Sequence, residues 1–109
     1  MIAFGNPVPP PPAPDAPVAS VRIEHGQVVL RWTAPPQRVT GYRVEYRAGD
    51  DAWGEIEQSL DASAHSVVAL QPKSSVTYAF RVRAINEGGP GAYSDPVTVG
   101  SSRRQAVRR

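Results

Sequence analysis

Hydrophobic and polar residues alternate most regularly between Tyr78 and Asn86. One side of an extended strand would carry Tyr78, Phe80, Val82 and Ala84, and the other side would carry Ala79, Arg81, Arg83 and Ile85. A period of two is typical of a strand with one buried face. We therefore expect a central strand at 78–86, with its apolar side in the core.

The same period predicts six further short strands along the chain. Their approximate ranges are 19–23, 28–33, 41–47, 53–58, 66–70 and 94–99. Glycine and proline lie between them, at positions such as Gly26, Gly49 and Pro72, where they favour turns and interrupt β-ladders. No segment shows the period of an amphipathic helix. Seven strands with turn signals about every ten residues predict an all-β fold, an antiparallel β-sandwich.

The length of the chain favours one folded domain with a tail at each end. Its 109 residues suffice for one hydrophobic core. We assign 1–14 to a proline-rich lead-in or linker, 15–100 to the domain and 101–109 to a basic disordered tail or linker. Prolines between Pro7 and Pro17 fix the backbone near the polyproline II conformation. A stiff spacer is the favoured interpretation of this stretch, and a ligand for a proline-recognising domain is the alternative.

The positive charge of the chain belongs to its tail. The formal net charge is +2, yet four arginines lie within 103–109, so residues 1–100 carry 8 basic and 10 acidic side chains, a net charge of −2. We therefore expect no nucleic acid partner for the folded domain, although the tail alone could bind nucleic acid or an anionic membrane. No stretch approaches the roughly 20 apolar residues of a membrane span, so no membrane insertion is expected. The N-terminal sequence lacks the features of a secretion signal.

Landmarks along the chain together resemble the fibronectin type III domain family. They are Leu30-Arg-Trp32 before Ala34-Pro-Pro36, Gly41-Tyr-Arg-Val-Glu-Tyr46, Leu70-Gln-Pro72, the 78–86 strand, Gly88-Gly-Pro-Gly91 and Ser94. The resemblance covers about Asp15 to Gly100. It implies an immunoglobulin-like sandwich of seven strands, with a three-strand sheet packed on a four-strand sheet and no disulfide. The absence of cysteine agrees with this.

The resemblance and the alternation together define a structural core. We expect it to contain Trp32, Tyr42, Val44, Leu70, Tyr78, Phe80 and Val82. By the resemblance, Trp32 is the core tryptophan and Tyr78 the tyrosine whose hydroxyl bonds backbone in the preceding corner. Leu70 lies eight residues before Tyr78, whereas six is usual in the family. That corner is therefore expected to be longer than usual: either the loop at 73–76 bulges outward, or the Tyr78 hydroxyl bonds a different partner.

The sequence offers no set of residues typical of an enzyme. His25 and His65 lack a second histidine or a cysteine at ligand spacing, so we expect neither a metal site nor a cofactor. Asp61, His65 and Ser66 lie within six residues, where a catalytic triad is improbable. The absence of cysteine leaves the cellular compartment undetermined.

The face opposite the core holds the candidate binding residues. Strands at 41–47 and 78–86 are expected to be neighbours, so that Arg43, Arg47, Arg81 and Arg83 project together, and the strand at 53–58 would add Trp53, Glu55 and Glu57. The favoured interpretation is a solvent face neutralised by its own carboxylates and by cation–π contacts. The alternative is a basic patch for a sulfated glycan or an acidic partner.

Taken together, these features predict a non-catalytic fibronectin type III module. We expect it to be a spacer and a protein–protein interaction or adhesion unit of a larger multidomain protein, and a monomer when isolated. Its partners would be other protein domains. The host would be an extracellular, cell-surface or phage-tail protein. The alternative function is a polysaccharide-binding or sulfated-glycan-binding module that uses Trp53 and the arginine-rich face, with an anionic glycan as partner.

Overall fold

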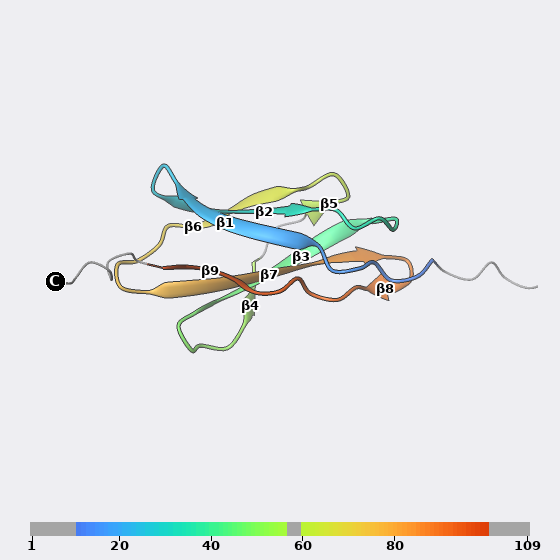
Figure 1. The fold of residues 1–109 in the computed structure, drawn as a ribbon. Helices are drawn as coiled ribbons and strands as arrows, with labels where there is room; N and C mark the ends of the chain where they lie inside the picture. Colours follow the sequence, from blue (N-terminus) through green and yellow to red (C-terminus); the bar gives the residue numbers. More distant parts are fainter. Residues whose placement is uncertain (1–10, 57–59, 101–109) are drawn as a thin grey trace, which may run out of the picture.

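Two antiparallel β-sheets pack face to face in the protein (Figure 1). The structure is a computed structural model, and it describes residues 11–56 and 60–100. Within these ranges there is no helix, and hence no helix long and apolar enough to cross a membrane. The expected all-β sandwich is therefore confirmed.

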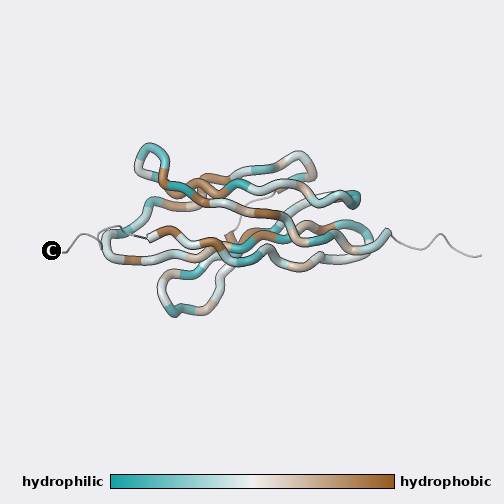
Figure 2. Tube along the Cα trace, viewed as in Figure 1, coloured by the Kyte–Doolittle hydropathy of each residue, from teal (hydrophilic) through white to brown (hydrophobic). Residues whose placement is uncertain are grey.

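The smaller sheet has three strands, as expected. Its order is β1 (Val18–Glu24), β2 (Gln27–Thr33) and β6 (Ser66–Leu70). His25 and Gly26 form the turn between β1 and β2, and both adopt positive φ angles, of 51° and 77°. Figure 2 shows this turn as hydrophilic, whereas hydrophobic positions recur along the strands.

The larger sheet is built around β3 (Gly41–Ala48) and β7 (Thr77–Asn86), which pair from Gly41↔Ile85 to Ala48↔Tyr78. In the described part of the chain it has six strands, whereas four were expected. Three of the six are only two residues long. The other four are β4 (Gly54–Glu55), β5 (Leu60–Asp61), β8 (Gly89–Pro90) and β9 (Val97–Gly100).

Two expected strands differ from the observed ones. Of the strand predicted at 53–58, Gly54 and Glu55 pair with β3 as β4, whereas Glu57 and Gln58 lie outside the described residues. Part of the expected connection that follows pairs with β3 as β5. The strand predicted at 94–99 begins only at Val97. Pro96 precedes it and has no backbone N–H to donate to a ladder, which accounts for the late start.

The core lies between the two sheets. Six of the seven expected core residues are at most 5% exposed, and Leu70 is partly buried. Phe80, Val44 and Val82 have no exposed surface. The core also contains Val28, Leu30, Val67 and Ala84, all fully or nearly fully buried.

A β-bulge decides which side of β6 faces the core. Val28 pairs with Leu70 and Val29 with Val68, so that Ala69 is an extra residue on β6. Val67, paired with Leu30, is buried, while Val68 is 49% exposed. Beyond the extra residue, Leu70 is again partly buried, so the bulge interrupts the strict alternation of sides.

The long corner before β7 is closed by a hydrogen bond. Tyr78, 4% exposed, accepts the backbone N–H of Lys73 on its hydroxyl oxygen at 3.0 Å. Ser75 has a positive φ of 65° and helps the chain to turn within the longer loop. The lengthened corner is thus compatible with the hydrogen bond that the family resemblance implied.

Candidate functional site

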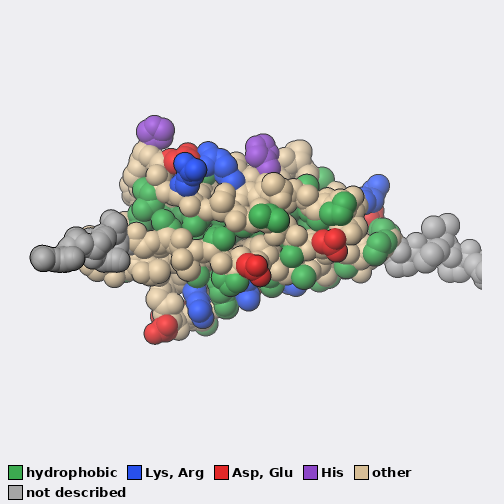
Figure 3. All heavy atoms as spheres, in the orientation of Figure 1, with side chains coloured by type: hydrophobic (Ala, Val, Ile, Leu, Met, Phe, Trp, Pro, Cys, Tyr) green, Lys and Arg blue, Asp and Glu red, His purple; other side chains and the backbone are tan. Residues whose placement is uncertain are grey.

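The outer face of β3 and β7 brings the expected binding residues together. We call it the arginine–aromatic face; it consists of Arg43, Glu45, Arg47, Trp53, Glu55, Arg81, Arg83 and Tyr93. The register pairs Arg43 with Arg83 and Glu45 with Arg81, on the side opposite the core. In the space-filling view, Lys and Arg side chains gather along the lower face, over the larger sheet (Figure 3).

Two of the four arginines are paired with carboxylates. Arg81 donates from Nε to Glu45 Oε1 at 2.9 Å, and this pair is mostly buried. Arg43 donates from Nη1 to Glu55 Oε2 at 3.1 Å, in a pair that is about half exposed. These two guanidinium groups are therefore neutralised by the face itself.

Arginines and aromatic rings form a continuous stack across this face. The Arg81 guanidinium carbon lies 4.2 Å from the ring centroid of Trp53 and 4.2 Å from that of Tyr93. Arg83 lies 4.4 Å from the Tyr93 centroid, and Arg47 lies 5.0 Å from the Trp53 centroid. Cation–π attraction of this kind is stronger where water is partly excluded.

Arg47 and Arg83 lie at the two ends of this stack, and neither has a carboxylate partner in the ranges 11–56 and 60–100. Their Nε atoms are buried without a hydrogen bond in those ranges. The arginine cluster predicted from the sequence thus exists, but only half of its guanidinium groups are left without an opposite charge.

Tyr93 is the member of this face that the sequence analysis missed. It lies in the segment after the glycine-rich loop, which has no alternating pattern. Ser94 provides the signal in retrospect: it faces inward, accepting Val82 N–H on Oγ at 3.0 Å and donating its own N–H to Val82 O at 2.7 Å. Tyr93 therefore points outward, beside the arginines of β7. Burial raises the pKa of its hydroxyl and the Glu45 carboxylate adds to this, while Arg83 and Arg81 oppose it.

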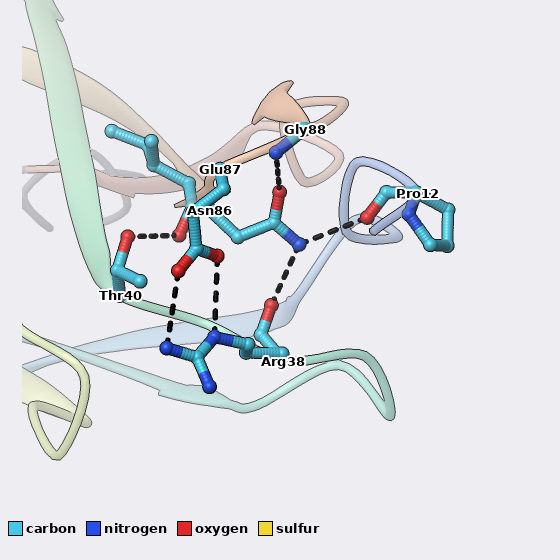
Figure 4. A network of polar contacts seen from close by, with 7 residues as sticks. Pro12, Arg38, Thr40, Asn86, Glu87 and Gly88 are labelled. Atoms are coloured by element: carbon cyan, nitrogen blue, oxygen red, sulfur yellow. Dashed lines mark hydrogen bonds and ion pairs between the residues drawn. The ribbon is translucent and has the colours of Figure 1, made fainter. Parts of the chain in front are cut away.

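A second polar network lies at one end of the sandwich, where the loops around Arg38 and Glu87 meet (Figure 4). Asn86, 5% exposed, donates from Nδ2 to the carbonyl oxygens of Pro12 and Arg38, each at 2.8 Å. Its Oδ1 accepts the N–H of Gly88 at 2.7 Å. One side chain thus joins the lead-in to two loops of the domain.

Asp61 and His65, two of the three residues weighed for a catalytic triad, both contact Ser63. Asp61 Oδ1 accepts the N–H of Ser63 at 3.0 Å and its hydroxyl at 2.8 Å, and these bonds lower the pKa of Asp61. His65 is exposed, and its Nδ1 contacts the Ser63 carbonyl at 3.4 Å. Among the residues described, no group of three His, Cys, Asp or Glu could hold a metal ion.

Comparison with known proteins agrees with this architecture. The family model for the fibronectin type III domain matches residues 11–100. The Drosophila melanogaster protein sidekick is 32% identical over 90 residues, covering 77% of this chain and 4% of that protein. Human myomesin-2 is 33% identical over 91 residues, covering 79% of this chain and 6% of that protein. The chain thus spans only a small part of the curated relatives that it matches.

Solved structures show the same fold. A myokine structure superposes with a TM-score of 0.70 at 23% identity, covering 84% of this chain and all of that one. The structure of titin kinase and its flanking domains superposes with a TM-score of 0.70 at 24% identity, covering 86% of this chain and 18% of that one. The sandwich, its core tyrosine and tryptophan, and the family match over 11–100 lead to one conclusion: this chain belongs to the fibronectin type III domain family.

Proposed function

We propose that this chain is a non-catalytic spacer and protein-interaction module of a longer, multidomain protein. The observation that carries the proposal is where the described chain enters and leaves the domain. Pro12 is bonded to Asn86, the last residue of β7, and Gly100 pairs with Thr77, its first residue. Entry and exit are therefore separated by the length of β7, about 30 Å at roughly 3.4 Å per residue (Figure 1).

The relatives support this role in a coarser way. The matched region is 4% of sidekick and 6% of myomesin-2, as expected when such a module is one part of a long chain. A domain that is entered at one end and left at the other adds its whole length to such a chain. This arrangement also leaves the outer faces of the two sheets accessible to partners.

Small-angle X-ray scattering of two copies fused end to end tests the spacer role. We expect an extended particle, longer than the single chain by roughly one domain length. A fused pair that folds back on itself, with a maximum dimension close to that of one copy, would contradict the proposal.

A second candidate function is binding of an anionic glycan at the arginine–aromatic face. It is favoured by Arg47 and Arg83, which have no carboxylate partner within 11–56 and 60–100 and whose guanidinium groups are held over aromatic rings. Planar guanidinium groups suit sulfate and carboxylate recognition because they offer paired N–H donors. Trp53, partly exposed between Arg47 and Arg81, would add a flat ring to this surface.

Heparin chromatography of a chain ending at Gly100 tests this second function, because the four tail arginines are then absent. We expect retention at moderate salt, reduced by Arg47→Gln or Arg83→Gln and little changed by Arg43→Gln, whose guanidinium group is already paired with Glu55. Elution at low salt, or equal effects of all three substitutions, would argue against a glycan site here.

A further inference from the structure

Residues 11–14 lie directly against the loop end of the domain. Pro14 is buried and so is Gly91, although both lie outside the strands. Pro12 accepts a hydrogen bond from Asn86, which is 74 residues away in the chain. The part of the lead-in that the structure describes is therefore packed on the domain.

Two glycines are explained by the close approach of this segment. A Cβ atom at Gly88 would overlap the carbonyl oxygen of Pro11, and one at Gly91 would overlap that of Pro14. Neither glycine has a positive φ, in contrast to Gly89 between them, whose φ is 112°. Space for the proline backbone, and not backbone conformation, is what requires glycine at both positions.

The polar contacts suit a proline-rich backbone in particular. Prolines have no N–H group, so the carbonyl oxygens are the only backbone groups through which Pro11, Pro12 and Pro14 can hydrogen-bond. Asn86 supplies a donor to one of them and is itself held by Arg38 and Gly88. Both Nδ2 protons are donated and Oδ1 accepts one hydrogen bond, which fixes the orientation of the side chain.

We propose that Arg38, Asn86, Gly88 and Gly91 form a docking groove for an extended proline-rich backbone, and that residues 11–14 fill it. The fixed φ of proline lowers the entropy lost when such a segment is immobilised. When the groove is filled, it fixes the direction in which residues 11–14 enter the domain. This inference rests on the proposed spacer function and adds to it a rigid joint at the N-terminal end.

Distance measurements between two spin labels test the groove in the full chain. The protein has no cysteine, so Ala13→Cys and Thr98→Cys place labels at two exposed positions only. We expect a single narrow distance distribution. We expect Gly88→Ala or Gly91→Ala to broaden it several-fold, because the added Cβ displaces the proline backbone.

Gly54→Ala is the matched control. A Cβ at Gly54 meets nothing within 4 Å, and its φ is not positive, so this variant should keep the narrow distribution. A broad distribution in the protein with native glycines would overturn the proposal, as would equal widths in all variants. Neither result would affect the scattering test of the spacer, which depends on the shape of two fused copies.

A measurement on the unaltered chain keeps the proposal testable even if the glycine variants fail to fold. The side-chain amide protons of Asn86 are both donated, whereas Gln71 is exposed. We expect hydrogen exchange of the Asn86 side-chain amide to be slower than that of Gln71 by at least an order of magnitude. Equal exchange rates would overturn the proposal.

Discussion

The two sides of β7 are stabilised by different physics. The inward side consists of Tyr78, Phe80, Val82 and Ala84, none more than 4% exposed, and its stability comes from removing apolar surface from water. The outward side carries Arg81 and Arg83, which are held by two aromatic rings and one carboxylate. The free energy gained by burying apolar surface does not depend on the orientation of the groups, whereas stacking and ion pairing require a specific geometry. Truncating an inward side chain of β7 should therefore cost more stability than changing an outward one, although the outward contacts are more sensitive to geometry.

Phe80→Ala should have the largest effect on stability. Phe80 has no exposed surface and stacks on Tyr46 with ring centroids 6.1 Å apart, so truncation loses transfer free energy and leaves a cavity. We expect a loss of about 3–5 kcal/mol in the free energy of unfolding, measured by urea denaturation. The control is Val68→Ala, at an apolar residue that is 49% exposed, where the loss should be much smaller. Similar midpoints for the two variants would contradict the assigned core.

Arg81→Lys tests the outward side, where the charge is kept but the planar group is lost. Arg81 stacks between Trp53 and Tyr93 and bonds Glu45 from a mostly buried position. Lysine cannot stack in this way or make the same paired hydrogen bonds. We expect destabilisation of about 1–2 kcal/mol by urea denaturation.

The matched control for Arg81→Lys is Arg43→Lys, since Arg43 makes a more exposed ion pair with Glu55. Its effect should stay below about 0.5 kcal/mol. If Arg43→Lys cost as much as Arg81→Lys, the stack would contribute nothing beyond an ordinary surface charge.

Tyr78→Phe tests the hydrogen bond made by the Tyr78 hydroxyl, the polar group on the inward side of β7. The substitution keeps the buried ring and removes only the hydroxyl that accepts the Lys73 N–H at 3.0 Å. We expect a loss of about 1 kcal/mol in the free energy of unfolding, together with faster hydrogen exchange of the Lys73 amide. An unchanged Lys73 exchange rate would mean that the longer corner does not depend on this bond.

The sequence predicted the strands of both sheets where alternation was uninterrupted. β3 and β7 are examples, because eight consecutive residue pairs keep the same register and so the same buried side. At β6 the predicted bounds of 66–70 are correct, but one extra residue at Ala69 interrupts the alternation of sides and leaves no mark on local composition. Within the described part of the predicted strand at 53–58, Gly54 and Glu55 pair with β3, and Ile56 donates its N–H to the Val44 carbonyl oxygen.

The arginine–aromatic face was predictable in part. Arg43, Arg47, Arg81, Arg83 and Trp53 follow from strand neighbours and alternation, and the structure brings them together. Tyr93 could not be found in this way because it stands outside any alternating segment. The contacts of Asn86, Gly88 and Gly91 with residues 11–14 were not predictable, since they go to backbone carbonyl oxygens, and composition alone predicts a stiff spacer.

Tyr42→Phe should have the smallest effect at neutral pH and a distinct effect at alkaline pH. Tyr42 is 4% exposed, and its hydroxyl has no hydrogen-bond partner in the described part of the chain. Removing a buried hydroxyl without a partner costs little, so we expect a change below about 0.5 kcal/mol at pH 7. Burial raises the pKa of Tyr42, and the nearby Trp32 only partly opposes this.

The unfolded chain should ionise Tyr42 near its ordinary pKa of about 10, while the folded protein still holds the proton. The unfolded state then binds fewer protons, so the free energy of unfolding falls as pH rises from about 10 towards the folded pKa. Tyr42→Phe removes this contribution, and urea denaturation at pH 8 and at about pH 10.5 should show a smaller alkaline loss in the variant. Parallel losses in both proteins would mean that the Tyr42 hydroxyl is better solvated than its burial indicates.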